Sequence, residues 1–224
     1  MKILAIDTTT NVLTVAVTDG LRVVSEYYID HKRTHSQKLM PVIEGILKDA
    51  GTEISEIDGY AVANGPGSFT GIRIGLTAAR TLAQVTGKKV SPVNTLLGLA
   101  CNLSFTNGVV CAALDARNEN LYFGVYKFKD GKVKTILEPC FLSADEVNSY
   151  LASKRWKAYA VGDIELIDKN IVKTADCRFN MPKASSVAFA AQMTDNWYNY
   201  NEADACYISK PQAQRELEER EKNK

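Results

Sequence analysis

A glycine-rich string, Gly65-Pro66-Gly67-Ser68-Phe69-Thr70-Gly71, contains the residue types in this sequence that are best suited to anion binding. Glycine permits backbone conformations that other residues avoid, and free N–H groups at the start of a following helix attract phosphate. One interpretation is that Gly65, Gly67 and Ser68 contact the phosphates of a nucleotide. The other is a tight turn that needs glycine only for steric reasons, since the Gly-Lys-Ser/Thr of a P-loop does not follow. The residues alone leave both open.

Two aspartates each open a polar turn after an apolar strand. Asp7 precedes Thr8 and Thr9, whose hydroxyls could join it in holding magnesium and phosphate. The same carboxylates could instead cap their own turns through Asx hydrogen bonds. Both interpretations stay open for Asp7. For Asp115 we favour turn capping, because its turn has no glycine and the bulky Arg117 would obstruct the approach of a phosphate.

The histidines do not form a convincing catalytic or metal site. Only two are present, His31 and His35, and the intervening Lys32-Arg33-Thr34 would repel a cation. No glutamate lies between them as in zinc peptidases, and two histidines in one segment offer little basis for a Ser-His-Asp triad or a Cys-His pair. We therefore expect no catalytic residue and no metal ligand, and we expect His35 to orient the start of a helix.

Residues 3–17 and 111–125 form an internal repeat that aligns without a gap at an offset of 108, placing Asp7 on Asp115. Each copy reads as strand, polar turn and strand, followed by a third strand at 21–30 or 132–142. Further strands are predicted at 59–63, near 90 and at 158–161, and helices at 36–50, 71–86, 95–103, 144–153 and 186–198. The pattern predicts a duplicated α/β fold with lobes at 1–105 and 106–224. The alternative is that two strand–turn–strand units, which are common in proteins, resemble each other by chance.

Small residues recur every four positions in the second helix, at Gly71, Gly75 and Ala79. Glycine inside a helix usually has a packing reason, and such a stripe lets another helix approach closely. We expect a partner surface on this helix and the preceding one, which contributes Leu39 and Ile43. The alternative is that the stripe faces a crowded core.

The composition is that of an ordinary globular protein. The 224 residues are 46% hydrophobic and 24% charged, and 27 basic against 26 acidic side chains give a net charge of +1. Proteins that hold nucleic acid by charge alone are far more basic. No apolar run is long enough to span a bilayer, and the five cysteines include no C-x-x-C pair. We expect a cytoplasmic protein, with the mixed-charge run at 215–222 solvated.

Five strings of the sequence resemble one family, in order along nearly the whole chain: M-K-I-L-A-I-D-T-T-T, G-P-G-S-F-T-G-I-R-I-G, V-N-T-L, L-D-A-R and C-Y-I. They are similar to the TsaB (YeaZ) family, the dimerisation subunit of the bacterial machinery that makes threonylcarbamoyladenosine in tRNA. The resemblance implies a duplicated actin, heat-shock-chaperone ATPase and sugar-kinase-like (ribonuclease H-like) fold. It also implies a heterodimer with the catalytic paralogue TsaD, cooperation with the ATPase TsaE, and a homodimer when alone. Contact with tRNA, and any ADP or ATP with magnesium, would belong to the complex.

The resemblance also implies a subunit that does not catalyse the transfer. The catalytic paralogue carries a metal-binding His-x-x-x-His after a Val-Asn pair, and here Thr95 and Leu99 stand at those positions. Neither side chain can hold iron or zinc there. The first alternative is an active small-molecule kinase or ATPase that uses Asp7, the glycine-rich loop and Asp115. A metallopeptidase is the second, and it is disfavoured by the same two substitutions.

Overall fold

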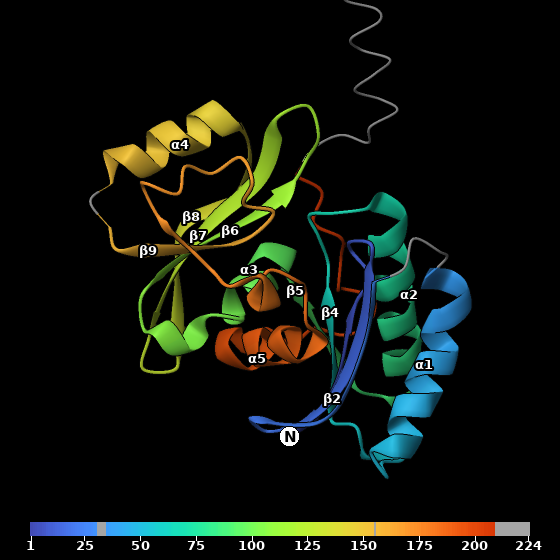
Figure 1. Cartoon of the computed structure of the whole chain (residues 1–224). Coiled ribbons are helices and arrows are strands. Elements are labelled where there is room, and N and C mark those ends of the chain that lie inside the picture. The colour runs from blue at the N-terminus through green and yellow to red at the C-terminus, as the bar shows by residue number, and fades with distance from the viewer. Residues whose placement is uncertain (31–34, 155, 209–224) are drawn as a thin grey trace, which may run out of the picture.

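The computed structural model describes residues 1–30, 35–154 and 156–208, so His31 and the charged run at 215–222 lie outside it. Two five-stranded mixed sheets form the two lobes (Figure 1). The first has the order β3-β2-β1-β4-β5, with β1 Lys2–Asp7, β2 Val12–Asp19, β3 Arg22–Asp30, β4 Gly59–Ala63 and β5 Lys89–Val93. The second has the order β8-β7-β6-β9-β10, with β6 Val109–Asp115, β7 Asn120–Lys129, β8 Lys132–Ser143, β9 Ala158–Gly162 and β10 Lys173–Thr174.

Each lobe therefore repeats one topology. The first three strands form an antiparallel meander, the fourth pairs in parallel with the first, and the fifth pairs in parallel with the fourth. This third-second-first-fourth-fifth order in both sheets confirms the predicted duplicated, two-lobed α/β fold of the ribonuclease H-like class.

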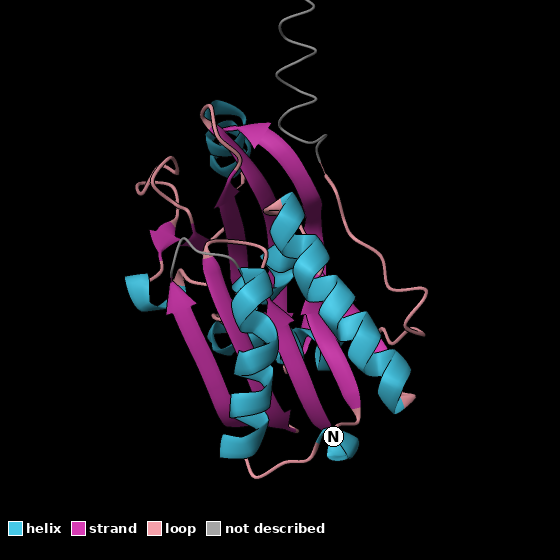
Figure 2. Cartoon of the chain, turned by 90° about the vertical axis from the view of Figure 1, so that its right-hand side faces the viewer, coloured by secondary structure: helices cyan, strands magenta, loops and turns pink. Residues whose placement is uncertain are grey.

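Helices form three layers around the two sheets. Helices α1 (His35–Asp49) and α2 (Phe69–Thr86) lie side by side across the outer face of the first sheet (Figure 2). Helices α3 (Thr95–Cys101) and α5 (Ala184–Thr194) lie between the sheets, and α4 (Ala144–Ser153) covers the outer face of the second. Short 3-10 helices occur at Ile54–Glu56, Ser104–Thr106 and Cys177–Phe179. No helix in the described ranges is both long and apolar enough to cross a membrane.

Local sequence signals explain the bounds of α1 and α2. In α1, Leu39, Ile43 and Ile46 recur at helical spacing and are buried against the first sheet. The side chain of Ser68 accepts from the N–H of Gly71 and caps the start of α2, and Gly87 ends it in the left-handed conformation at φ 67°.

The internal repeat is present, but its alignment changes by one residue between strands. Val17 pairs with Leu4 in the first lobe, and Val125 pairs with Cys111 in the second. Val17 and Val125 both contact the outer helices, so the second strands match at the predicted offset of 108. The first strands match at 107, the difference between Cys111 and Leu4.

The predicted match of Asp7 with Asp115 is therefore wrong. By strand pairing Asp7 corresponds to Leu114, because the second hairpin contains one additional residue. Asp7 alternates in phase with Ala5, which contacts the helices between the sheets. Asp115 is in phase with Ala113, which belongs to the core under α4. The one-residue shift places the two carboxylates in opposite phases of their sheets.

The last helix ends earlier than predicted. The pattern predicts a helix over 186–198, whereas α5 ends at Thr194 and Asp195 adopts the left-handed conformation at φ 51°. Beyond it, Tyr198 forms an isolated antiparallel bridge with Val90 at the edge of the first sheet. Tertiary pairing with β5 thus overrides the helical pattern.

The chain also returns to the first lobe after α5. The N–H of Cys206 donates to the carbonyl of Asn64 at 2.8 Å, next to the glycine-rich loop. The part of the predicted second lobe (106–224) that carries Tyr198 and Cys206 thus contacts the first lobe, and the lobe bounds themselves stay a prediction.

Candidate functional site

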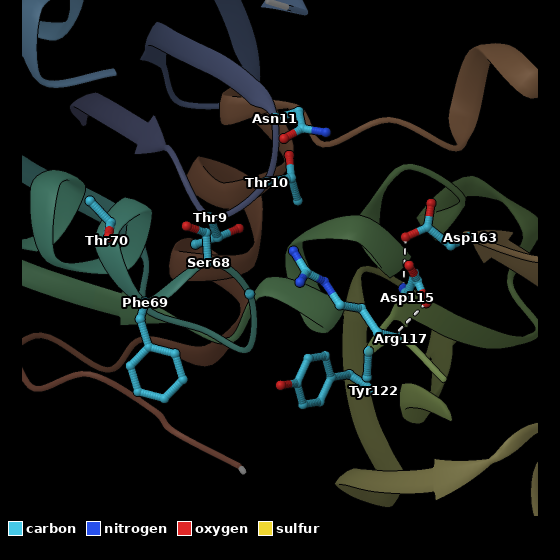
Figure 3. Close-up of a pocket in the computed structure, with 12 residues that line it drawn as sticks. Thr9, Thr10, Asn11, Ser68, Phe69, Thr70, Asp115, Arg117, Tyr122 and Asp163 are labelled. Carbon is cyan, nitrogen blue, oxygen red and sulfur yellow. Dashed lines mark hydrogen bonds between the residues drawn. The ribbon is translucent and has the colours of Figure 1, made fainter. Parts of the chain in front are cut away.

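A cleft of about 480 Å³ lies between the turns of the two lobes (Figure 3). The first lobe contributes the β1–β2 turn and the start of α2, and the second contributes the β6–β7 turn and the residue after β9. Its lining consists of Thr9, Thr10, Asn11, Gly67, Ser68, Phe69, Thr70, Asp115, Ala116, Arg117, Tyr122 and Asp163.

Asp7 caps its own turn instead of facing the cleft. Its side chain is 2% exposed, and one carboxylate oxygen accepts from the N–H of Thr9 at 2.8 Å and from the Thr9 hydroxyl at 2.7 Å. Burial raises the pKa of Asp7 to about 6, against the opposing effect of the Thr9 hydrogen bonds and the charge of His35. The observed contacts are those of the turn-capping interpretation.

The glycine-rich loop packs directly on the β1–β2 turn. The N–H of Ser68 donates to the carbonyl of Thr9 at 2.7 Å, and the hydroxyl of Thr8 donates to the carbonyl of Gly71 at 2.7 Å. A Cβ at Gly67 would overlap the Thr9 carbonyl, and one at Gly71 would overlap the Thr8 carbonyl. The steric interpretation of these two glycines therefore has direct support.

The second-lobe side of the cleft carries two carboxylates and a guanidinium. Asp115 accepts from the N–H of Arg117 at 2.8 Å, which is the turn-capping contact we favoured for it. The N–H of Asp115 donates to the carboxylate of Asp163 at 2.8 Å, and burial raises the pKa of Asp163. The side chain of Arg117 extends across the cleft toward Thr9 and Ser68 (Figure 3). The predicted obstruction of a phosphate by Arg117 stays a prediction, because a guanidinium in this position could also attract a phosphate.

The backbone of the β6–β7 turn is strained where it lines the cleft. Arg117, Asn118 and Glu119 adopt positive φ angles of 67°, 52° and 58° in succession. A left-handed conformation costs an L-residue about 1 kcal/mol or more, and non-glycine residues rarely adopt it in series. The turn holds Arg117 in the cleft at this cost.

Of the six predicted phosphate contacts, three line the cleft and three do not. Thr9, Gly67 and Ser68 line it, whereas Asp7 and Thr8 are buried beneath the turn. Gly65 faces the returning C-terminal segment, since its Cβ would overlap the carbonyl of Cys206. Sequence reasoning missed Asp163 and Tyr122; the signal for Asp163 was its position directly after the buried strand β9.

The positions of the paralogue's histidine pair belong to the core here. The Thr95 hydroxyl accepts from the N–H of Gly65 at 3.2 Å, and Leu99 is 1% exposed between the sheets. Nowhere in the described ranges do three metal-ligating side chains cluster. His35 begins α1, and its Nε2 lies 2.8 Å from the carbonyl of Thr10, so it carries the proton and ties the helix to the β1–β2 turn.

The small-residue stripe of α2 faces the core of its own chain. Gly71, Gly75 and Ala79 are all buried, and a Cβ at Gly75 would stand 2.5 Å from the Thr8 hydroxyl. The crowded-core alternative therefore describes the stripe. The five residues predicted to face a partner are all buried against the first lobe, and their contact with a partner stays a prediction: Gly71, Gly75, Ala79, Leu39 and Ile43.

An open apolar groove of about 650 Å³ does lie on the same two helices. Its exposed apolar contribution includes Met40, which is 50% exposed, and the partly exposed Ile74, Ala78 and Leu82. The lining of this α1–α2 groove consists of Ser36, Leu39, Met40, Thr70, Arg73, Ile74, Thr77, Ala78, Thr81 and Leu82. The predicted pair of helices thus presents an apolar surface, which Leu39 lines together with residues that neighbour the other four.

Comparison with known proteins supports the resemblance seen in the sequence. The solved structure of YeaZ from Pseudomonas aeruginosa superposes with a TM-score of 0.80 at 26% identity, covering 92% of this chain and 99% of that one. A family model described as TsaD, tRNA N6-adenosine threonylcarbamoyltransferase, matches residues 22–223. The chain belongs to the TsaB (YeaZ) family.

Curated TsaB proteins share part of their length with this member of the family. The tRNA threonylcarbamoyladenosine biosynthesis protein TsaB of Bacillus subtilis is 36% identical over 137 residues, which are 61% of this chain and 60% of that protein. The protein of the same name from Escherichia coli is 38% identical over 130 residues, 57% of this chain and 55% of its own length. The matched region therefore spans about 60% or less of these relatives.

Proposed function

We propose that this TsaB-family chain is a non-catalytic subunit of the assembly that makes threonylcarbamoyladenosine in tRNA. In this proposal it pairs with a TsaD-type catalytic paralogue and cooperates with the ATPase TsaE. The observation that carries the proposal is the α1–α2 groove on a chain of this family. All five cysteines are free thiols, which suits the reducing cytoplasm in which we place the assembly.

The groove has the character of a docking surface for a similar protein. Its lining combines the apolar side chains of Met40, Ile74, Ala78 and Leu82 with Arg73 and three threonines. Apolar centres with polar rims are typical of protein interfaces. A paralogue with the same two helices could pair through them in a pseudo-twofold arrangement, and a second copy of this chain could do so when the paralogue is absent.

The cleft supports a non-catalytic role. Asp7 is engaged by Thr9 beneath its turn, and Thr95 and Leu99, at the positions of the paralogue's histidine pair, belong to the buried core. If ADP or ATP with magnesium takes part, this proposal assigns it to the assembly and not to the lone chain.

Reconstituted tRNA modification tests the proposal. Threonylcarbamoyladenosine formation by the paralogue and TsaE should require this chain and should fall at least tenfold with Met40→Asp, which puts a charge in the groove. Val85→Asp is the matched control, because Val85 is 80% exposed on the same helix pair but outside the groove lining. Full modification without this chain would contradict the proposal.

A further inference from the structure

The hairpin of β7 and β8 carries four lysines on one face. Lys127 pairs directly with Lys134, and Lys129 pairs directly with Lys132. Directly opposite residues of an antiparallel pair project from the same face, as do residues two apart along a strand. All four side chains are exposed, so their ammonium groups form a compact patch, here termed the lysine face.

The opposite face of the hairpin fixes the lysines in place. Phe128 is 2% exposed in the core between the sheets, and its N–H donates to the carbonyl of Gly108 at 2.9 Å. Val133 packs against the same core. The turn residues Asp130 and Gly131 have φ angles of 51° and 72°, as the preferred two-residue hairpin turn requires. Alternation along the strands then directs the lysines outward.

Protection of a sheet edge does not account for this pattern. Lysines on edge strands prevent unwanted pairing between chains, which is sufficient reason for Lys132 and Lys134 on the edge strand β8. Lys127 lies on β7 and is paired on both sides, with Val109 and with Lys134. Like charges placed directly opposite each other destabilise a sheet, so this arrangement indicates a role that compensates for the repulsion.

The charge of the lysine face is local and unbalanced. Residues 127–134 hold four lysines and one aspartate, a net charge of +3 in a chain whose total is +1. None of the ion pairs recorded among the described residues includes one of these lysines. The patch therefore suits a ligand with several closely spaced negative charges.

We propose that the lysine face binds the phosphate backbone of RNA. This inference rests on the proposed function, which supplies a tRNA substrate. The hairpin belongs to the second lobe, whereas α1 and α2 lie on the far side of the first (Figure 1), so docking through the α1–α2 groove leaves it exposed. Four lysine–phosphate contacts give only weak binding to RNA by themselves, and in the assembly they add to the RNA contacts of the other subunits.

Salt-dependent binding of the full chain to a fluorescently labelled anticodon stem-loop RNA tests the proposal. Each phosphate contact contributes about −0.7 to −0.9 to the slope of log K against log salt. The double variant Lys129→Gln/Lys132→Gln should lower the magnitude of the slope by about 1.5. Lys129→Arg/Lys132→Arg, which keeps the charge, should retain the wild-type slope.

The matched control is Lys88→Gln/Lys89→Gln, which removes the same charge from the first lobe and should leave the slope unchanged. The midpoint temperature of thermal unfolding should be no lower in the hairpin variant than in wild type, because the change removes repulsion between lysines. An unchanged slope in Lys129→Gln/Lys132→Gln, or an equal loss of slope in the control, would overturn the proposal. The proposal would also be overturned if the hairpin variant lost binding to phosphatidylserine vesicles but kept its binding to the RNA. Modification that does not require this chain would instead overturn the proposed function, so the two failures are distinguishable.

Discussion

The hydroxyl of Thr8 donates to the carbonyl oxygen of Gly71 at 2.7 Å, and the two backbones are so close that a Cβ on Gly71 would overlap the Thr8 carbonyl. This contact joins the two strings of the sequence that look most like a nucleotide site, the Asp-led turn and the glycine-rich loop. In this chain the two strings pack on each other. Their residues are therefore explained by packing before any ligand is considered.

Gly71→Ala should destabilise the protein by about 1–3 kcal/mol, because the added methyl group overpacks against backbone that cannot move alone. Gly45→Ala on α1 is the matched control, since nothing lies within 4 Å of its Cβ position. Alanine there should stabilise the helix by about 0.5–1 kcal/mol. Urea unfolding measures both, and equal effects at the two glycines would contradict the packing argument.

Asp7→Asn should reveal the cost of burying a carboxylate. The folded-state pKa of about 6 lies above the ordinary value of 3.8, so the folded chain holds the proton more tightly than the unfolded chain. The stabilisation of the folded chain that comes from the protonated Asp7 carboxyl is fully present at low pH, and it is lost as pH rises from about 4 to about 6. Two pKa units correspond to at most about 3 kcal/mol.

Asparagine does not titrate, and its side-chain oxygen can still accept from Thr9. The variant should therefore gain stability relative to wild type between pH 4 and 6 and keep a constant advantage above. Urea unfolding from pH 4 to 8 measures this difference. A difference that does not change with pH would show that Asp7 is not buried as an isolated carboxyl.

The lone chain should release phosphate from ATP and magnesium no faster than the blank. The reason is that the Asp7 carboxylate, which such a reaction would need for magnesium, is engaged by Thr9 beneath the turn. A phosphate-release assay on the purified chain measures this. Turnover that Asp7→Ala abolishes would instead support the alternative of an active kinase or ATPase.

Secondary structure was predictable wherever local signals agree with the tertiary fold. The strand Gly59–Ala63 and the helix Ala144–Ser153 have the predicted bounds, because apolar runs, caps and turn residues mark their ends. The two-residue strand at Lys173–Thr174 was missed, since only its parallel pairing with β9 defines it.

The candidate site was harder to predict because it depends on register and on facing partners. A one-residue insertion in the second hairpin moves Asp115 out of the phase of Asp7, and a sequence alignment without pairing data cannot detect it. The spacing of Gly71 and Gly75 indicates a close approach, but it does not identify the neighbour, which is Thr8 of the same chain.

The molar mass of this chain mixed with its TsaD-type paralogue, measured by analytical ultracentrifugation, tests the central claim most directly. We predict a one-to-one heterodimer. Met40→Asp should abolish this heterodimer and Val85→Asp should leave it intact, because Met40 lines the α1–α2 groove and Val85 does not. Separate sedimentation of the two wild-type proteins, or a heterodimer unaffected by Met40→Asp, would contradict it.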